Sequence, residues 1–331
     1  MSTRRPTRRD VALKAGVAPS TVSLVLQNKG DELRIPACTQ DRVREAARSL
    51  GYYPNWHIGS VLKGRSGVLG LYLRWDQWCR PDGYWPTLHW NVQCAVAEAD
   101  VRLLVHNARR ECPTEEAFAR QAGGIVDGVI ILNSGKDPIV NRIVEVGLPA
   151  VEIGDPYSQL PFVGNDGGEG IRLAMEHLSE RGYKWPAYIG HYTSYEEAAN
   201  VRKQAFAYDA RNLFGLDGAQ RTLLTLHVSE VFDALLSINP RPDCVICESD
   251  EYAYQLLQLC ATRGISVPEE LAIVGSDALP AFGSLRVMTS IASPMKEMAT
   301  WGIQKLLAII EGRPIEHGTM LPSTLRIGDT T

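Results

Sequence analysis

The chain has 331 residues, a net charge of −4 and 45% hydrophobic residues, which fits a globular protein of two or three domains rather than a single compact core. No apolar run approaches the roughly 20 residues of a membrane helix. The basic start MSTRRPTRR has no apolar signal core behind it. We therefore expect a cytoplasmic protein that does not associate with membranes.

The seven cysteines are an odd number and are mostly spread apart, which fits reduced thiols in the cytoplasm. Only Cys244 and Cys247 have CxxC spacing, and they lie in CVIC, a predicted buried strand. Side chains alternate along a strand, so these two thiols do not converge. Because no second CxxC is present, we interpret them as structural thiols rather than a redox or zinc site.

The stretch from Thr7 to Asn28 predicts two short helices joined by a tight turn. Thr7 is a good helix N-cap, and Asp10 completes a variant of the capping box. Gly16 can adopt the left-handed conformation that ends a helix. Pro19 is suited to the first position of the second helix, where its missing N–H is not needed.

In the second helix, Val22, Val25 and Leu26 fall on one face. The opposite face carries Ser20, Ser23, Leu24 and Gln27. Small polar side chains on a short helix, over a tightly turned partner, suit insertion into the DNA major groove. The alternative is an ordinary helical hairpin in a structural bundle.

A third helix is expected from Thr39, as its cap, to Gly51, which ends it. Residues 1–66 hold 12 Lys and Arg against 5 Asp and Glu, a net charge of +7. The remainder holds 22 against 33, a net charge of −11. A basic module on an acidic body is the charge distribution expected of a nucleic-acid-binding protein.

The segments DVALKAGVAPSTVSLVLQNKG and TQDRVREAARSLGYYPN resemble the headpiece of the LacI/GalR family of bacterial transcription regulators, and the resemblance continues more loosely to the end of the chain. It implies a homodimeric regulator, expected to be a repressor, that binds palindromic double-stranded operator DNA and a small-molecule effector. The DNA-binding residues that it implies are Thr7, Pro19, Ser20, Thr21, Ser23, Leu24, Asn28 and Tyr52. The family often has Arg where Leu24 stands, and Leu can touch a thymine methyl but cannot bond bidentately to guanine.

Residues 55–66 match the position of the family's hinge, which folds into a helix on operator DNA and wedges a side chain into the minor groove. Val61 or Leu62 would be the wedge. Gly59 costs such a helix up to about 1 kcal/mol relative to Ala, and a flexible tether is the alternative. The predicted domains are a headpiece at 1–54, this hinge, and an effector-binding and dimerisation domain at 67–331.

From Gly67 onward, apolar runs alternate with helical stretches, which predicts an α/β fold of doubly wound parallel sheets with ligands at the carboxyl ends of the strands. The expected strands are 68–73, 101–106, 128–132, 150–153, 186–190, 244–247 and 272–275. The expected helices are 91–100, 114–122, 139–146, 170–181, 194–212, 251–264 and 295–311. The GNDGGEG run has neither GxGxxG nor P-loop spacing, and no catalytic pattern stands out. We expect neither an enzyme nor a cofactor.

The resemblance implies a two-lobed sensor like a periplasmic sugar-binding protein, with lobes at 67–163 plus 293–320 and 164–292 plus 321–331, joined by three crossovers. The effector-binding residues carried over by motif are Asp166, Arg202, Ser249 and Asp277. Ser249 stands where the family usually has Asn, which puts that polar contact in doubt. Taken alone, each acid could instead be a surface or capping carboxylate.

Four tryptophans fall within sixteen residues between the first strand and the first helix of the body. Aromatic faces stack well on sugar rings, and in the family this loop lines the effector cleft. The candidates here are Asp76, Trp78, Tyr84 and Trp85, and a packed loop or a dimer contact is the alternative. The effector is predicted to be a neutral sugar or sugar derivative, with a purine as the rival. A solute-binding protein without regulatory role is a further alternative, but it would lack the headpiece.

Overall fold

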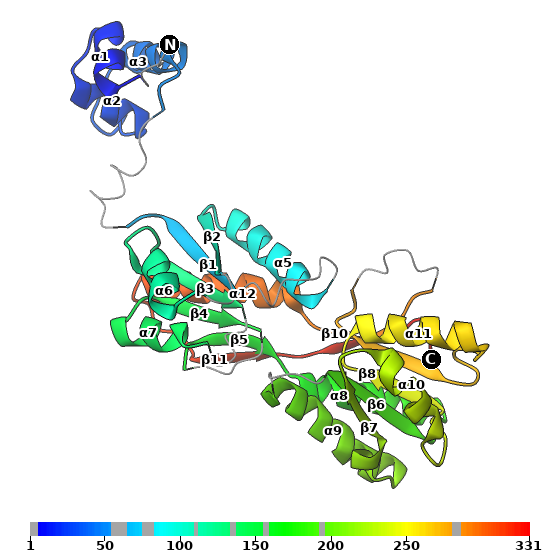
Figure 1. Ribbon diagram of the computed structural model, residues 1–331. Coiled ribbons are helices and arrows are strands. Elements are labelled where there is room, and N and C mark those ends of the chain that lie inside the picture. Colours follow the sequence, from blue (N-terminus) through cyan, green and yellow to red (C-terminus); the bar gives the residue numbers. More distant parts are fainter. Residues whose placement is uncertain are drawn as a thin grey trace. The chain divides into compact units, whose positions relative to one another are not determined.

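The computed structural model describes residues 6–53, 65–74, 83–108, 112–132, 137–154, 159–191, 196–279 and 286–331. The chain divides into two compact units, Met1–Ser66 and Gly67–Thr331, and each is described by itself (Figure 1). The expected hinge wedge residues Val61 and Leu62 lie outside the described residues, as do Asp76 and Trp78.

The first unit, the headpiece, holds the helices α1 (Arg8–Ala15), α2 (Pro19–Leu26) and α3 (Ala37–Leu50). The predicted capping box is confirmed: the Thr7 side chain accepts from the Asp10 backbone N–H, and the Asp10 carboxylate accepts from the Thr7 backbone N–H at 2.7 Å. Gly16 ends α1 in the left-handed conformation, as expected. The core that joins the three helices is built from Val11, Ala12, Ala15, Val22, Val25, Val43, Ala46 and Ala47.

The third helix begins at Ala37, with Pro36 at its N-cap, so the expectation that Thr39 caps it is wrong. The buried Gln40 explains the earlier start. Its amide nitrogen donates to the Asp31 carboxylate at 2.8 Å and to the Ile35 carbonyl at 2.9 Å. These bonds hold the preceding loop against the first turn of α3. Thr39 therefore lies inside the helix and not at its N-cap.

The second unit, the body, contains two six-stranded sheets. In the first, all neighbouring strands are parallel, and the order is β11-β5-β4-β3-β1-β2. Its strands are β1 (Val68–Arg74), β2 (Arg102–Ala108), β3 (Gly128–Leu132), β4 (Ala150–Ile153), β5 (Phe162–Asn165) and β11 (Gly318–Leu321). This sheet and its helices form the first lobe.

The second sheet has the order β12-β10-β9-β8-β6-β7, and its edge strand β12 runs antiparallel to β10. Its strands are β6 (Pro186–His191), β7 (Thr222–Thr225), β8 (Cys244–Cys247), β9 (Ala272–Ser276), β10 (Thr289–Ala292) and β12 (Thr324–Arg326). This sheet and its helices form the second lobe. The predicted architecture of parallel sheets within a doubly wound α/β fold is confirmed.

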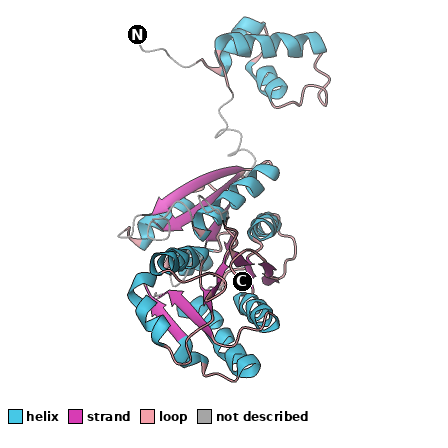
Figure 2. Ribbon diagram, turned by 90° about the vertical axis from the view of Figure 1, so that its right-hand side faces the viewer, coloured by secondary structure: helices cyan, strands magenta, loops and turns pink. Residues whose placement is uncertain are grey.

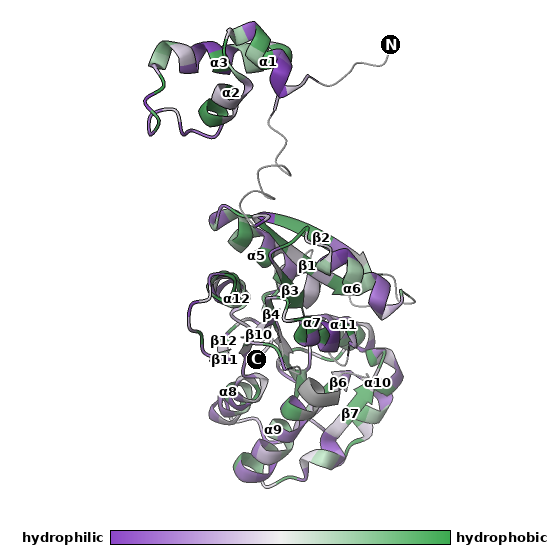
Figure 3. Cartoon of the chain, turned by 90° about the vertical axis from the view of Figure 1, so that its left-hand side faces the viewer, coloured by the Kyte–Doolittle hydropathy of each residue, from purple (hydrophilic) through white to green (hydrophobic). Residues whose placement is uncertain are grey.

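Helices cover both faces of each sheet (Figures 2 and 3). On the first sheet, α5 (Tyr84–Glu98) and α12 (Met295–Ile310) pack together on one face, and α6 (Thr114–Ala122) and α7 (Ile139–Val146) lie on the other. On the second, α8 (Gly167–Glu180) and α9 (Glu196–Phe214) form one layer, and α10 (Val228–Ser237) and α11 (Asp250–Arg263) form the other. A short 3₁₀ helix, η2 (Gly218–Arg221), precedes β7. No helix in the described ranges combines the length and the apolar character needed to cross a bilayer.

Two helices of the body start three or more residues earlier than the sequence predicted. The helix α5 begins at Tyr84 instead of Asn91, because Pro86 stands in its first turn, where a backbone N–H has no helical partner. The helix α8 begins at Gly167 instead of Gly170, because Asp166 caps it. The strands absent from the prediction are β5, β7, β10, β11 and β12.

Cys244 and Cys247 lie in the buried strand β8, as predicted, and both are free thiols. Burial raises the pKa of each thiol well above its usual value, so both remain protonated. A protonated, buried thiol is a poor nucleophile and a poor metal ligand. The geometry supports the structural interpretation of this CxxC pair.

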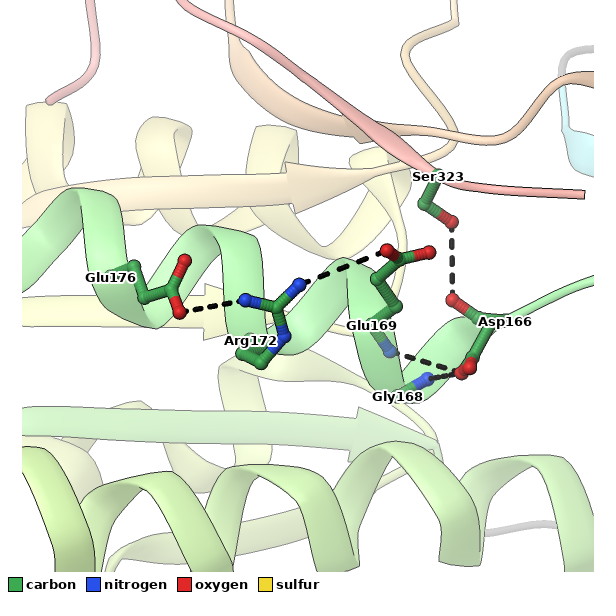
Figure 4. A network of polar contacts seen from close by, with 6 residues as sticks. All are labelled: Asp166, Gly168, Glu169, Arg172, Glu176 and Ser323. Atoms are coloured by element: carbon green, nitrogen blue, oxygen red, sulfur yellow. Dashed lines mark hydrogen bonds and ion pairs between the residues drawn. The ribbon is translucent and has the colours of Figure 1, made fainter.

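The chain passes between the two sheets three times, and one side chain ties the three passages together. The amide nitrogen of Asn165 donates to the hydroxyls of Ser293 and Ser323, each at 3.3 Å. The Ser323 hydroxyl in turn donates to the Asp166 carbonyl at 3.2 Å (Figure 4). The first passage is therefore bonded directly to each of the other two.

Candidate functional site

The recognition face of the headpiece lies on α2. Val22 and Val25 are fully buried in the headpiece core, whereas Ser20 is exposed. Leu24 is partly exposed, between these two extremes. The helix therefore faces as its apolar spacing predicts. The candidate residues that the structure brings together on this helix are Pro19, Ser20, Thr21, Ser23 and Leu24.

Arg8, which the sequence reasoning did not single out, lies beside this face. Its guanidinium Nη1 donates to the Ser23 hydroxyl at 2.9 Å, and that hydroxyl donates to the Pro19 carbonyl at 3.3 Å. Arg8 is the first residue of α1 and is exposed. Its position directly after the predicted cap Thr7 could have identified it, because in a helix–turn–helix the start of the first helix packs close to the second helix.

The other headpiece candidates have structural roles. Thr7 caps α1. Asn28 is exposed and has a left-handed φ of 58°, in the turn that follows α2. Tyr52 packs against the headpiece core. Thr7 and Tyr52 therefore stabilise the headpiece, Asn28 forms part of the turn after α2, and none of the three lies on α2 itself.

In the body, the polar candidates gather where strands of the second sheet end and where the chain enters α8. Asp166 is exposed, and its Oδ1 accepts from the backbone N–H groups of Gly168 at 2.9 Å and Glu169 at 3.0 Å (Figure 4). It is thus the N-cap of α8. Ser249 has the same role at α11, since its hydroxyl accepts from the Tyr252 backbone N–H at 3.3 Å.

Arg202 on α9 lies against the start of α8 and reaches toward the end of β8. A Cβ added at Gly167 would lie only 2.9 Å from its Nε, so the glycine allows this close approach. Its Nη1 lies 4.0 Å from the Oε1 of Glu248, the residue directly after β8. Sequence reasoning missed Glu248, because only the packing of α9 on the sheet brings the two residues together.

Asp277 follows β9 and is almost fully buried. Its φ is 100° and that of Ala278 is 49°, conformations that non-glycine residues seldom adopt. Its backbone N–H donates to the Ile291 carbonyl at 2.7 Å. The Ser276 hydroxyl donates to the Cys247 carbonyl at 3.0 Å, which holds this segment beside the end of β8. Backbone strain of this kind is found preferentially at functional sites.

A buried carboxylate, also missed by sequence reasoning, holds the strained segment in place. Asp250 accepts from the Ser290 hydroxyl at 2.5 Å and from the Leu279 backbone N–H at 2.6 Å. Ser290 also accepts from the Ala278 backbone N–H at 2.9 Å. Burial raises the pKa of Asp250 to about 6. Asp250 is therefore a positioning residue for the loop that carries Asp277.

The same loop reaches the first lobe. Leu279, two residues after Asp277, is part of the apolar core of that lobe, together with Met295 of α12. Tyr84 and Trp85 pack against this core, with their rings edge to face at a centroid distance of 4.9 Å. Trp85 was expected in a loop and instead lies in the first turn of α5. The structure thus brings the two aromatic candidates to the cluster that contains Leu279.

Two family models match the chain. One, described as bacterial regulatory proteins, lacI family, matches residues 7–55, and the other, a periplasmic binding protein-like domain, matches residues 175–331. A ribose operon repressor from Halalkalibacterium halodurans is 26% identical over 344 residues, which cover 98% of this chain and 97% of that protein. These matches span both the headpiece and the body.

Solved structures agree with this assignment. A complex of the transcriptional regulator CelR with cellobiose has a TM-score of 0.71 at 25% identity, covering 99% of this chain and 100% of that one. A lac repressor dimer bound to operator and the anti-inducer ONPF has a TM-score of 0.80 at 19% identity, covering 99% of each chain, and so shares the fold. With both of its units matched and its whole length covered by relatives, the chain belongs to the lacI family of bacterial regulatory proteins.

Proposed function

We propose that this protein is a dimeric repressor that binds palindromic operator DNA and is controlled by a neutral sugar or sugar derivative. The observation that carries the DNA-binding part is the headpiece, a capped helix–turn–helix whose second helix buries its valines and presents Ser20 and Leu24. Relatives over the full length carry the names of operon repressors.

The headpiece offers two kinds of DNA contact. Ala18, at the N-cap of α2, has no side-chain acceptor to occupy the first N–H groups of that helix, which suits them to a backbone phosphate. Leu24 provides an apolar contact suited to a thymine methyl. Arg8 lies beside the same face and supplies a guanidinium for a phosphate or a base edge. Phosphate contacts would fix the register, and α2 would read the bases.

Selection of bound fragments from genomic DNA, followed by affinity measurement at several salt concentrations, tests this part. We expect a shared near-palindrome, because a two-fold dimer reads two half-sites. The slope of log K against log salt should be about −0.9 for each phosphate neutralised. Fragments without a common palindrome, or an affinity that does not depend on salt, would contradict the proposal.

The effector part is supported by the arrangement at the ends of β5, β8 and β9. Arg202 provides a fork of donors and Asp277 an acceptor, a combination suited to vicinal hydroxyls. One solved relative is a complex with cellobiose, and a relative known by its sequence is named a ribose operon repressor. We propose that a sugar bound between the lobes favours one closure state, and by linkage it must then shift DNA affinity.

Arg202→Ala and Asp277→Ala test the effector site. Both variants should lose the change in DNA affinity on ligand addition and keep DNA binding without ligand. Arg172→Ala is a matched control, because Arg172 lies on the exposed side of α8 between Glu169 and Glu176 (Figure 4). A ligand response that survives both site substitutions would place the effector elsewhere.

A purine is the rival effector. Thermal unfolding of the full chain with a panel of saccharides and purine bases decides between the two classes, since a ligand that binds only the folded state raises the unfolding temperature. Stabilisation by a purine and by no saccharide would overturn the sugar assignment and leave the repressor assignment intact.

The dimer is supported by exposed apolar side chains on three elements of the first lobe. The strand β2 is the edge of the first sheet, and its Leu104 and Val105 are more than a third exposed. Trp90 on α5 is 65% exposed, and Trp301 on α12 is 48% exposed. Burial of such residues favours self-association. Trp90→Glu should therefore raise the dissociation constant measured by analytical ultracentrifugation, and an unchanged constant would remove Trp90 from the interface.

A further inference from the structure

Glu248 and Arg202 form an ion pair at the carboxyl end of the second sheet, within the proposed effector site. The Oε1 of Glu248 lies 4.0 Å from the Nη1 of Arg202, and each side chain is only 15% exposed. The pair joins α9 to the residue that follows β8. Solvent screens such a pair much less than a surface pair.

The carboxylate of Glu248 is held in place by the end of β6. Its Oε2 accepts a short hydrogen bond from the backbone N–H of His191, the last residue of β6. A Cβ added at Gly190 would lie 3.0 Å from the same oxygen, so the glycine leaves the space that the carboxylate fills. One oxygen of Glu248 is thus bonded to the sheet, and the other faces the guanidinium of Arg202.

An unpaired arginine in such a place would be an anion site. A guanidinium matches the geometry of a phosphate or carboxylate and binds either strongly. With Glu248 at 4.0 Å, the pair is neutral before any ligand arrives. An anionic ligand reaching Arg202 would also meet the negative charge of Glu248, whereas a hydroxyl can donate to the carboxylate and accept from the guanidinium.

We propose that Glu248 sets the charge selectivity of the effector site, so that the site accepts neutral polyhydroxy ligands and rejects sugar phosphates and sugar acids. This rests on the proposed effector-binding function, and it adds a selectivity residue to it. The buried hydroxyl of Tyr188 lies in the same region and has no hydrogen-bond partner among the described residues.

The first test does not depend on knowing the effector. The probe is inorganic phosphate, titrated against thermal unfolding of the full chain at constant ionic strength. Glu248→Gln keeps an amide oxygen for the His191 N–H but removes the charge. We expect saturable stabilisation of Glu248→Gln by millimolar phosphate, at least tenfold tighter than in the native chain, and its loss in Arg202→Gln/Glu248→Gln. Equal phosphate binding by the native chain and Glu248→Gln would overturn the proposal.

The second test uses matched sugars: a neutral aldose, its uronate and its 6-phosphate, for each aldose that the native chain binds. The ratio of neutral to anionic affinity should fall at least tenfold in Glu248→Gln and stay unchanged in Glu176→Gln, an exposed carboxylate paired with Arg172. Native preference for the anionic member, or an unaltered ratio, would overturn the proposal. If no saccharide binds, the proposal of a sugar effector is wrong. The phosphate titration then still tests whether Glu248 excludes anions.

Discussion

The headpiece and the body build their sites from contacts of very different range. In the headpiece, Thr7 and Asp10 cap each other three positions apart, and Arg8 reaches Ser23 only 15 positions away. In the body, Asp250 and Ser290 are 40 positions apart, and Asn165 and Ser323 are 158 apart. The headpiece site therefore depends mostly on nearby residues, whereas the loop of Asp277 and the pairing of Arg202 depend on the folding of a whole lobe, and only the caps Asp166 and Ser249 are local.

The largest effect should come from Val25→Arg, which puts a charge into the fully buried core of a small unit. Burying an unpaired charge costs about 4 kcal/mol or more, and a unit of this size has little stability to spare. We expect an unfolded headpiece and no DNA binding, with the thermal transition of the body unchanged. Calorimetry and circular dichroism of the full chain measure both.

Leu24→Arg is the matched control, because Leu24 is partly exposed on the same helix. It should leave the headpiece folded and change base preference by about 1–3 kcal/mol at one position, in favour of guanine. If both arginine variants unfolded the headpiece, or neither did, the assignment of Val25 to the buried face of α2 and Leu24 to its outer face would be wrong.

The next largest effect concerns Asp250 in the body. Its raised pKa means that the folded state holds this proton more tightly than the unfolded chain does, so its contribution to stability is present below the ordinary value of 3.8 and is lost as pH rises through about 6. Relative to Asp250→Asn, the native chain should lose roughly 3 kcal/mol between pH 4 and pH 7, because each pKa unit is worth ~1.4 kcal/mol.

Urea unfolding of both proteins across this pH range measures the difference. A difference that stays constant with pH would mean that Asp250 is not perturbed. Ligand affinity measured on the same pair should also change, because Asp250 holds the loop that carries Asp277. A purely local role, as in the headpiece, would leave ligand affinity unaltered.

A smaller effect is expected from Ser323→Ala. The change removes the donor to the Asp166 carbonyl and one of the two acceptors of Asn165, at a cost of about 2 kcal/mol. Only the unfolding transition of the body should move. Ser237→Ala is a control, because that hydroxyl bonds within its own exposed helix end. An equal loss of unfolding free energy in the two variants would show that the bonds of Ser323 stabilise the body no more than an ordinary surface hydrogen bond does.

The smallest effect is expected from Thr7→Ala, which removes the cap of α1 at a cost of about 1 kcal/mol. Only the headpiece transition should move, and DNA affinity should fall by no more than the lost stability accounts for. A shift in the body transition would show that the two units are coupled more closely than their separate hydrogen-bond networks suggest.

The same difference in range explains what could be predicted from the sequence. The capping box, the left-handed Gly16 and the facing of α2 all depend on neighbours within one turn, and all three were predicted. The start of α3 was not, because it depends on the loop bonds of Gln40. The parallel sheets followed from repeated apolar runs, although short strands such as β7 were missed.

In the body, motifs located Arg202 and Asp277 but not their neighbours. Glu248 and Asp250 flank Ser249, yet nothing in the ESD triplet says that one pairs with Arg202 and the other holds Leu279. Those partners come from α9 and from the end of β9, which only the folded sheet brings together. The capping bonds of Asp166 likewise require the actual start of α8.

The position of Leu279 has a consequence for protein engineering. A chimera that exchanges whole lobes between two relatives would place the Asp277 loop from one parent against the core of the other. The transplanted leucine would then meet a cavity of foreign shape, with Met295 and its neighbours drawn from the recipient. Grafting residues 277–279 together with α12 should preserve the packing of Leu279 against Met295. The position of the donor's Asp277 should then be preserved as well.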